Sequence, residues 1–301
     1  MVLDTENKNG YKVYNMKFSN LTDLHLYLKS NPEVNSRVFS EQSSLDKDTR
    51  FHGEHLDKCI DYCIGGYKTG FESFLKTSND LKKIGVADND TRTLKRSLYG
   101  GVPLAPLVAS GVPDCMLRYD RTEDLKYVTI YFNLGYPHFT TENEIVNRGL
   151  ATLHIIHALE NKGYIVNFKA FELSLCGDEM INISVDLKKP SDLFLNMEKC
   201  YFPIKAKEFL RRILFRVLES MPVENYSWSG GYGRAAELHE MKNFFGTKNT
   251  DLLIAAPREM GMGGDNIYDD TLTLIKKLNI QDEFDTNRIK KLSKEYRNNN
   301  Y

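Results

Sequence analysis

The 301-residue sequence has neither a long apolar run nor an excess of charge of one sign. No stretch approaches the ~20 apolar residues that a membrane-spanning helix needs. The N-terminus is polar from Asp4 onward and has no signal-peptide hydrophobic region. Lys and Arg total 40 against 41 Asp and Glu, whereas nucleic-acid-binding proteins usually carry a basic excess. These absences disfavour a membrane or secreted protein and weaken the case for nucleic acid as the main partner.

Cysteine is scarce and odd in number, with five residues in the chain. This usage favours reduced thiols and a cytoplasmic location. His52, His55, Cys59 and Cys63 have spacings that suggest zinc. On one straight helix, however, the first and last would lie ~16 Å apart along the axis, too far for metal bonds of ~2.0–2.3 Å. We therefore expect core cysteines and no metal.

Motifs for nucleophilic catalysis are also missing. The sequence contains no G-x-S-x-G elbow and no Cys-His signature, although a triad can assemble from residues that are distant in sequence. We predict no catalytic residue and no cofactor, and a non-enzymatic role is favoured.

The first part of the sequence, residues 1–122, has the pattern of a helical and irregular region packed on a core. Apolar spacing predicts helices over 20–29, 56–64 and 70–81. Three prolines and three glycines occur in residues 99–116, a composition that is typical of a loop.

Residues 123–280 alternate between strand and helix patterns, which predicts an α/β domain with a mostly parallel sheet flanked by helices. Residues 180–188 should pair antiparallel with 164–173, because the connection between them is too short for a crossover. The strongest helix pattern covers 203–221. Residues 281–301 are predicted to form a charged C-terminal tail or a frayed helix.

The unit from Lys126 to Phe168 reads as strand, loop, long helix, strand, with "NLGYP" as the loop. It resembles the von Willebrand factor type A family, and the resemblance extends over about 126–279. The resemblance implies a three-layer, Rossmann-like fold whose metal loop has the pattern Asp-x-Ser-x-Ser. That pattern falls here on Asn133, Gly135 and Pro137, which lack the oxygen ligands that a hard cation requires. The resemblance therefore implies a protein-recognition scaffold without its metal.

Ligands of open α/β sheets bind at the carboxyl ends of the strands. This places candidate residues in the loops 133–141 and 258–266, with Tyr136 and His138 as exposed contacts. A plain connection capped by Thr141 and Glu144 remains the alternative. The predicted binding residues are Asn133, Tyr136, His138, Tyr232, Arg234, Gly263 and Asp265.

A second candidate surface is the outer side of the 203–221 helix. Its basic residues could contact a nucleic-acid backbone or an acidic partner, but Glu208 and Glu219 interrupt the patch, and an ordinary solvated face is the simpler interpretation. This basic patch consists of Lys205, Lys207, Arg211, Arg212 and Arg216.

The whole chain also resembles an uncharacterised family of phage-encoded proteins. The segments "FHGEHLDKCIDYCIGGYKTG", "GVPLAPLVASGVPDCM" and "ENEIVNRGLATLHIIHALENKGYIV" carry this resemblance, which implies origin rather than mechanism. The leading hypothesis is a non-enzymatic binding protein in the host cytoplasm, with a protein partner. One alternative is an enzyme or sensor acting on nucleotides or nucleic acid, in which Asp265, Asp269 and Asp270 in the loop 258–270 hold a cation. Another is a structural virion component. The oligomeric state stays open.

Overall fold

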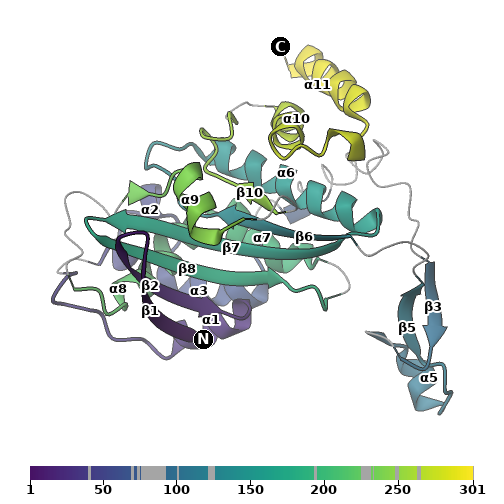
Figure 1. The fold of residues 1–301 in the computed structure, drawn as a ribbon, viewed down its shortest axis with the longest axis horizontal. Coiled ribbons are helices and arrows are strands. Elements are labelled where there is room, and N and C mark those ends of the chain that lie inside the picture. The colour runs from purple at the N-terminus through teal and green to yellow at the C-terminus, as the bar shows by residue number, and fades with distance from the viewer. Residues whose placement is uncertain are drawn as a thin grey trace.

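The computed structural model describes residues 1–39, 42–68, 71–72, 75, 93–99, 102–120, 126–192, 195–224, 232, 234–247, 251–262 and 266–300. A seven-stranded sheet forms its centre, in the order β1-β2-β8-β7-β6-β10, with β9 paired to β7 (Figure 1). The strands are β1 (Val2–Lys8), β2 (Tyr11–Phe18), β6 (Tyr127–Asn133), β7 (Ile165–Cys176), β8 (Glu179–Lys188), β9 (Arg234–Ala235) and β10 (Leu252–Ile254).

The pairing in this sheet is mixed. Strands β10, β6 and β7 are parallel, and β2 is parallel to β8. Strand β8 runs antiparallel to β7, which confirms the prediction made from their short connection.

The N-terminal residues correct the prediction that 1–122 are helical and irregular. Strands β1 and β2 form a hairpin whose two turn residues, Asn9 and Gly10, both have positive φ, as a tight two-residue hairpin turn requires. Through β2 the hairpin joins the central sheet. The sequence does not reveal β1 because this edge strand is polar and almost wholly exposed, so it has no alternating apolar pattern.

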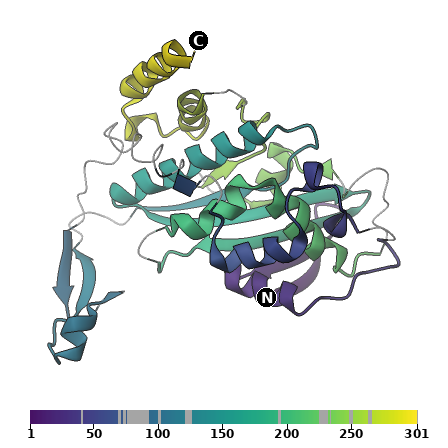
Figure 2. The same ribbon diagram turned by 180° about the vertical axis from the view of Figure 1, so that it is seen from behind.

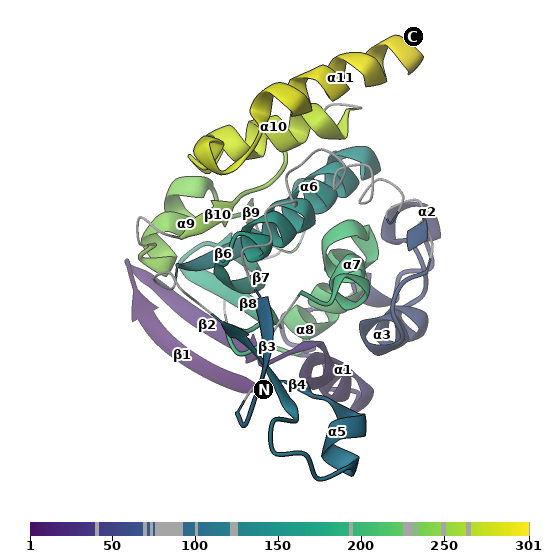
Figure 3. The same cartoon turned by 90° about the vertical axis from the view of Figure 1, so that its right-hand side faces the viewer.

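Helices cover both faces of the sheet unequally (Figures 2 and 3). Most lie against one face, and α9 lies against the other, where Phe245 contacts Tyr131 and Phe171. This confirms a mixed α/β fold with helices flanking the sheet. The helices of the larger group are α1 (Leu21–Lys29), α2 (Thr49–His52), α3 (Leu56–Gly65), α6 (Glu142–Asn161), α7 (Met197–Lys205) and α8 (Phe215–Glu219), and α9 spans Leu238–Phe245.

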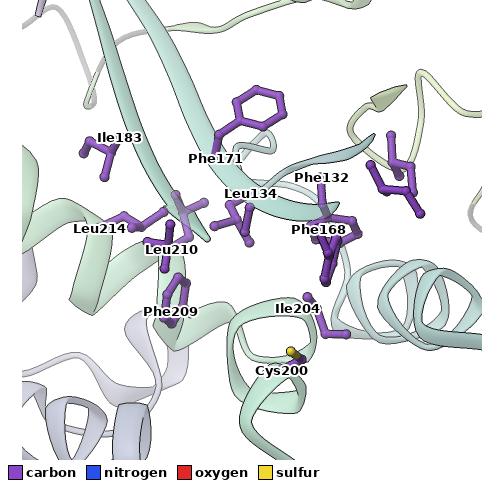
Figure 4. Packing of buried hydrophobic residues seen from close by; sticks show 14 of the residues in the cluster. Phe132, Leu134, Phe168, Phe171, Ile183, Cys200, Ile204, Phe209, Leu210 and Leu214 are labelled. Atoms are coloured by element: carbon purple, nitrogen blue, oxygen red, sulfur yellow. The ribbon is translucent and has the colours of Figure 1, made fainter. Parts of the chain in front are cut away.

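The main core lies between the sheet and α7 with the helical segment that follows it. Figure 4 shows Phe132 and Phe168 pointing from the strands toward Ile204, whereas Phe171 points to the opposite side of the sheet. All four side chains are almost fully buried. Burying a side chain of this size contributes on the order of 2–3 kcal/mol, so this layer holds β6 and β7 in place.

The helix predicted over 203–221 is divided in two. Helix α7 begins earlier, after the cap Asn196, and ends at Lys205, because the next residue, Ala206, has an extended backbone (φ −95°, ψ 126°). The chain then forms a π-helical segment (Phe209–Leu214) that continues into α8. The predicted apolar stripe is buried as expected, but the opposite side of the segment is buried as well.

The C-terminal residues form helices rather than a tail. Helix α10 (Ile267–Lys277) packs on α6, and α11 (Thr286–Asn300) packs on α10, after a short 3-10 turn, Gln281–Glu283. Asp269 of α10 accepts a hydrogen bond from Ser293 and pairs with Arg297, both at 2.6 Å.

A small three-stranded sheet lies apart from the main body (Figure 1). It consists of β3 (Thr93–Ser97), β4 (Val102–Pro103) and β5 (Met116–Asp120), with α5 (Ala105–Ala109) between the last two. The loop predicted from the prolines and glycines of 99–116 thus contains a strand and a helix. Most of the helix predicted over 70–81 lies outside the described residues. No helix among the described residues is long and apolar enough to cross a membrane.

Candidate recognition site at the carboxyl end of the parallel strands

The loop that follows β6 is fixed at its far end by the first turn of α6. The Thr141 hydroxyl accepts a hydrogen bond from the backbone N–H of Glu144, and the Glu144 carboxylate accepts one from the backbone N–H of Thr141 at 2.7 Å. This capping box confirms the predicted cap. Residues 134–140 therefore span a short gap between two rigid elements.

The near end of the loop is buried. The Asn133 side chain accepts a hydrogen bond from the backbone N–H of Gly135 at 2.9 Å, and Leu134 N–H donates to the Phe171 carbonyl of β7. A Cβ on Gly135 would come within 3.2 Å of Asn133 Oδ1 and 3.4 Å of the Ala235 methyl group. Asn133 is thus a buried residue that shapes the loop, and glycine at 135 lets β9 approach it.

Tyr136 is not the exposed contact that the sequence predicts. Its ring is buried, its hydroxyl faces the Lys207 carbonyl at 3.5 Å, and burial raises the pKa of Tyr136. His138 is exposed, as predicted, and its ring meets the edge of Phe139 at 5.2 Å between centroids. The outward-facing aromatic residue of the loop is Phe139.

Beneath the loop lie two buried ionisable residues that the sequence analysis missed. Arg148 of α6 donates to the Ala255 carbonyl at 2.7 Å and stacks on Phe132 at 4.4 Å. Burial lowers the pKa of Arg148 to about 10 and raises the pKa of Glu172, on β7, to about 8. Glu172 stands between Phe171 and Leu173 and interrupts an apolar run, which is the signal that could have identified it; Arg148, between Asn147 and Gly149, has no such signal.

This buried layer contains polar atoms whose hydrogen-bonding capacity is unused. Among the described residues, Glu172 Oε2 and Asn133 Nδ2 have no hydrogen-bond partner. Both residues come close to Gly135. A buried polar group without a partner costs on the order of 1–3 kcal/mol. These two atoms therefore lower the stability of this end of the sheet.

Most of the predicted basic patch is buried, and we call its three arginines, which hold backbone carbonyls of other segments, the clamp. Arg211, Arg212 and Arg216 are each buried, and only Lys205 and Lys207 are partly exposed. Burial lowers the pKa of Arg211 and of Arg212. The prediction that these arginines lie on a solvated outer face is therefore wrong.

Backbone carbonyls of the irregular N-terminal segment explain this burial. Arg212 donates to the carbonyls of Ser44, Asp46, Gly53 and Glu54. Arg216 similarly reaches the Pro32 carbonyl at 2.7 Å. A guanidinium offers five donors, which suits a segment whose carbonyls lack regular partners. Residues 31–39 and 42–54 thus cover the helical segment, and no periodicity in either stretch indicates the contact.

Arg211 holds two distant backbone segments together at the surface. It donates to the carbonyls of Phe51 and His138 and stacks on the Phe51 ring at 3.8 Å. Arg258, after β10, lies 4.3 Å from the Phe139 ring centre and pairs with Glu144 at 3.6 Å. We call Phe51, His138, Phe139 and Arg258 the aromatic rim. Phe51 and Phe139 are 38% and 49% exposed.

The remaining predicted site residues have other surroundings. The Tyr232 hydroxyl donates to Glu219 and accepts from the Ser43 N–H, and the residue is buried. Arg234 is exposed and pairs with Glu240 at 2.6 Å. Asp270 is buried. Gly263 and Asp265 lie outside the described residues. Within the described part of the chain, no three His, Cys, Asp or Glu side chains are grouped so that they could hold a metal ion.

Comparison with protein-family models identifies the family to which the chain belongs. A family model described as a domain of unknown function, DUF7192, matches residues 4–282. The chain belongs to the DUF7192 family. No curated protein and no solved structure matches it. The family match therefore spans the sheet, the clamp and the aromatic rim together without assigning them an activity.

Proposed function

We propose that this protein is a non-enzymatic binding protein that recognises a protein partner through the aromatic rim. The observation that carries the proposal is the position of Arg211, which ties Phe51 to His138 and so brings exposed aromatic side chains from two distant segments together. The predicted role of His138 is retained, and Phe139 takes the place that the sequence analysis gave to Tyr136.

The composition of the rim suits protein recognition. Aromatic and arginine side chains are enriched at the centres of protein interfaces and supply much of their binding energy. Here the rings are already held by stacking on Arg211 and Arg258. Because these side chains are ordered before binding, less conformational entropy is lost when a partner covers them.

The surroundings of His138 favour binding over catalysis. A histidine that acts as a general base is usually oriented by a hydrogen bond from its second ring nitrogen. Within the described residues, the His138 ring contacts Phe139 edge-on and has no hydrogen bond of that kind. A ring in this position contributes contact area and a polar edge.

The proposal extends to the origin of the scaffold. The crossover β6-α6-β7, with β10 parallel on the other side of β6, supports a von Willebrand A-like ancestry in which the metal loop has become Asn133, Gly135 and Pro137. A chain rich in Asn, Lys and Tyr suits an AT-rich phage genome, and we place the protein in the cytoplasm of the host cell.

A quantitative pull-down tests the proposed function. The wild-type chain, the double variant Phe139→Ala/Arg258→Ala and the control Leu26→Ala are immobilised and exposed to the same lysate of infected cells. Leu26 is an exposed apolar residue of α1. We expect a partner that the wild type and the control retain equally and that the double variant retains at least tenfold less. Equal retention of every captured protein by all three chains would refute the proposal.

A further inference from the structure

A groove of about 860 Å³ lies at the opposite end of the central strands. Its walls come from the start of β6, the edge strand β10, α9 and the C-terminal end of α10. Figure 1 shows β10 between α9 and α10. The groove adjoins residues 126–128, at the amino end of β6, whereas the aromatic rim lies beyond its carboxyl end. The two surfaces are therefore separate.

The floor of the groove is apolar and includes residues of the edge strand β10. Val128, Leu252, Leu253, Met260 and Leu278 line it and are buried. In the described part of the chain, β10 pairs with β6 alone and ends the sheet on this side. An edge strand presents backbone N–H and C=O groups that another strand can pair with.

The border of the groove is positively charged. Lys126, Lys242 and Lys277 line it, are exposed, and have no ion-pair partner among the described residues. Asp251 is the acidic residue of the lining, and it already has an interaction partner. Tyr127, which is 56% exposed, adds an aromatic surface beside them. The three lysines would therefore complement a negatively charged occupant.

We propose that this groove binds an extended acidic peptide segment of a protein partner, which adds to β10 as an outer strand. Side chains of an extended strand alternate between its two sides. Apolar side chains of the peptide would contact the floor while its carboxylates reach Lys126, Lys242 and Lys277. Backbone hydrogen bonds to β10 would supply affinity, as in other complexes in which a peptide extends a sheet.

Fluorescence anisotropy with synthetic peptides tests this inference on the full chain. The probe is a fluorescein-labelled octapeptide of alternating leucine and glutamate. At about 20 mM salt, where charge attraction is only weakly screened, we expect saturable binding. At about 200 mM salt, binding should be at least several-fold weaker. The double variant Lys242→Glu/Lys277→Glu should raise the Kd at least tenfold. Lys47→Glu, which reverses an exposed lysine outside the groove, should leave the Kd unchanged.

Two further peptides separate strand pairing from charge attraction. An octapeptide of alternating leucine and lysine should bind at least tenfold more weakly than the acidic probe. An acidic peptide with alternate backbone nitrogens methylated should also bind at least tenfold more weakly, because it cannot donate to a strand edge. The proposal is overturned if the acidic and basic peptides bind equally, if the lysine reversals have no effect, or if the methylated peptide binds as tightly as the probe.

Binding of the acidic peptide should not depend on the aromatic rim. Phe139→Ala/Arg258→Ala should bind the acidic octapeptide with the wild-type Kd, since the groove does not include either residue. If the wild-type chain binds the acidic peptide but retains no rim-dependent partner, the rim proposal fails and the groove proposal stands. If it retains the partner but does not bind the peptide, the groove proposal fails and the rim proposal stands.

Discussion

Replacing Glu172 with glutamine should make the protein more stable at alkaline pH. Glu172 is 4% exposed and lies on β7 in the buried layer below the loop. Burial raises the pKa of Glu172 from its ordinary value of 4.5 to about 8. The folded state therefore keeps the proton while the unfolded state releases it. The free energy of unfolding that this group contributes is fully present below pH 4.5 and is lost as the pH rises to about 8.

The size of this loss follows from the difference between the two pKa values. At about 1.4 kcal/mol for each pH unit, ionising Glu172 in the folded state costs on the order of 4–5 kcal/mol. Glutamine has the shape of the protonated acid and does not ionise. The free energies of unfolding of Glu172→Gln and wild type should be similar near pH 5, and the variant should gain about 3–4 kcal/mol relative to wild type by pH 8.5.

Urea unfolding followed by circular dichroism at several pH values between 5 and 9 measures this difference. Glu33→Gln, a change at an exposed position, serves as the matched control and should follow the wild-type curve. If Glu172→Gln and wild type change stability in parallel across this pH range, the buried carboxyl does not hold its proton and the reasoning is refuted.

Two changes test the framework of the site. Arg212→Lys keeps the positive charge, but its donors lie on one nitrogen and cannot reach the four carbonyls that three nitrogens of Arg212 contact. We therefore expect the free energy of unfolding, measured in urea, to fall by about 2–4 kcal/mol. A value within ~0.5 kcal/mol of wild type would show that the clamp contributes little. Thr141→Ala removes the hydroxyl that accepts the capping hydrogen bond and should lower the free energy of unfolding by about 1 kcal/mol. Thr141→Ser keeps the hydroxyl and should be nearly neutral. An equal loss for both variants would contradict a capping role.

Elements with a strong local pattern could be predicted from the sequence. Helix α1 begins after Asn20 and α3 ends near Gly66, as the capping residues indicate. The antiparallel pair β7 and β8 follows from a connection that allows no other arrangement. In each case, the residues that determine the structure are close together in the sequence.

Features that depend on distant contacts could not be predicted. From the sequence, the arginines of the segment 209–216 form a solvated face, but in the structure residues 31–39 and 42–54 cover them. The polar strand β1 has no pattern of its own and is a strand because β2 pairs with it. Tyr136 follows a glycine in a loop, a typical position for an exposed residue, but Arg211 and the helix beyond it enclose its ring.

The position of the N-terminal hairpin has a consequence for synthesis on the ribosome. Strand β2 pairs with β1 locally, but it can join the central sheet only when β8, ending at Lys188, has been made. At ~5–20 residues per second, that interval lasts roughly 10–30 s. During it, Val13, Tyr14 and Met16, which are buried in the finished protein, have no sheet to cover them. The hairpin is therefore made well before the strand that joins it to the central sheet, and we expect a chaperone that shields nascent chains to protect it throughout this interval.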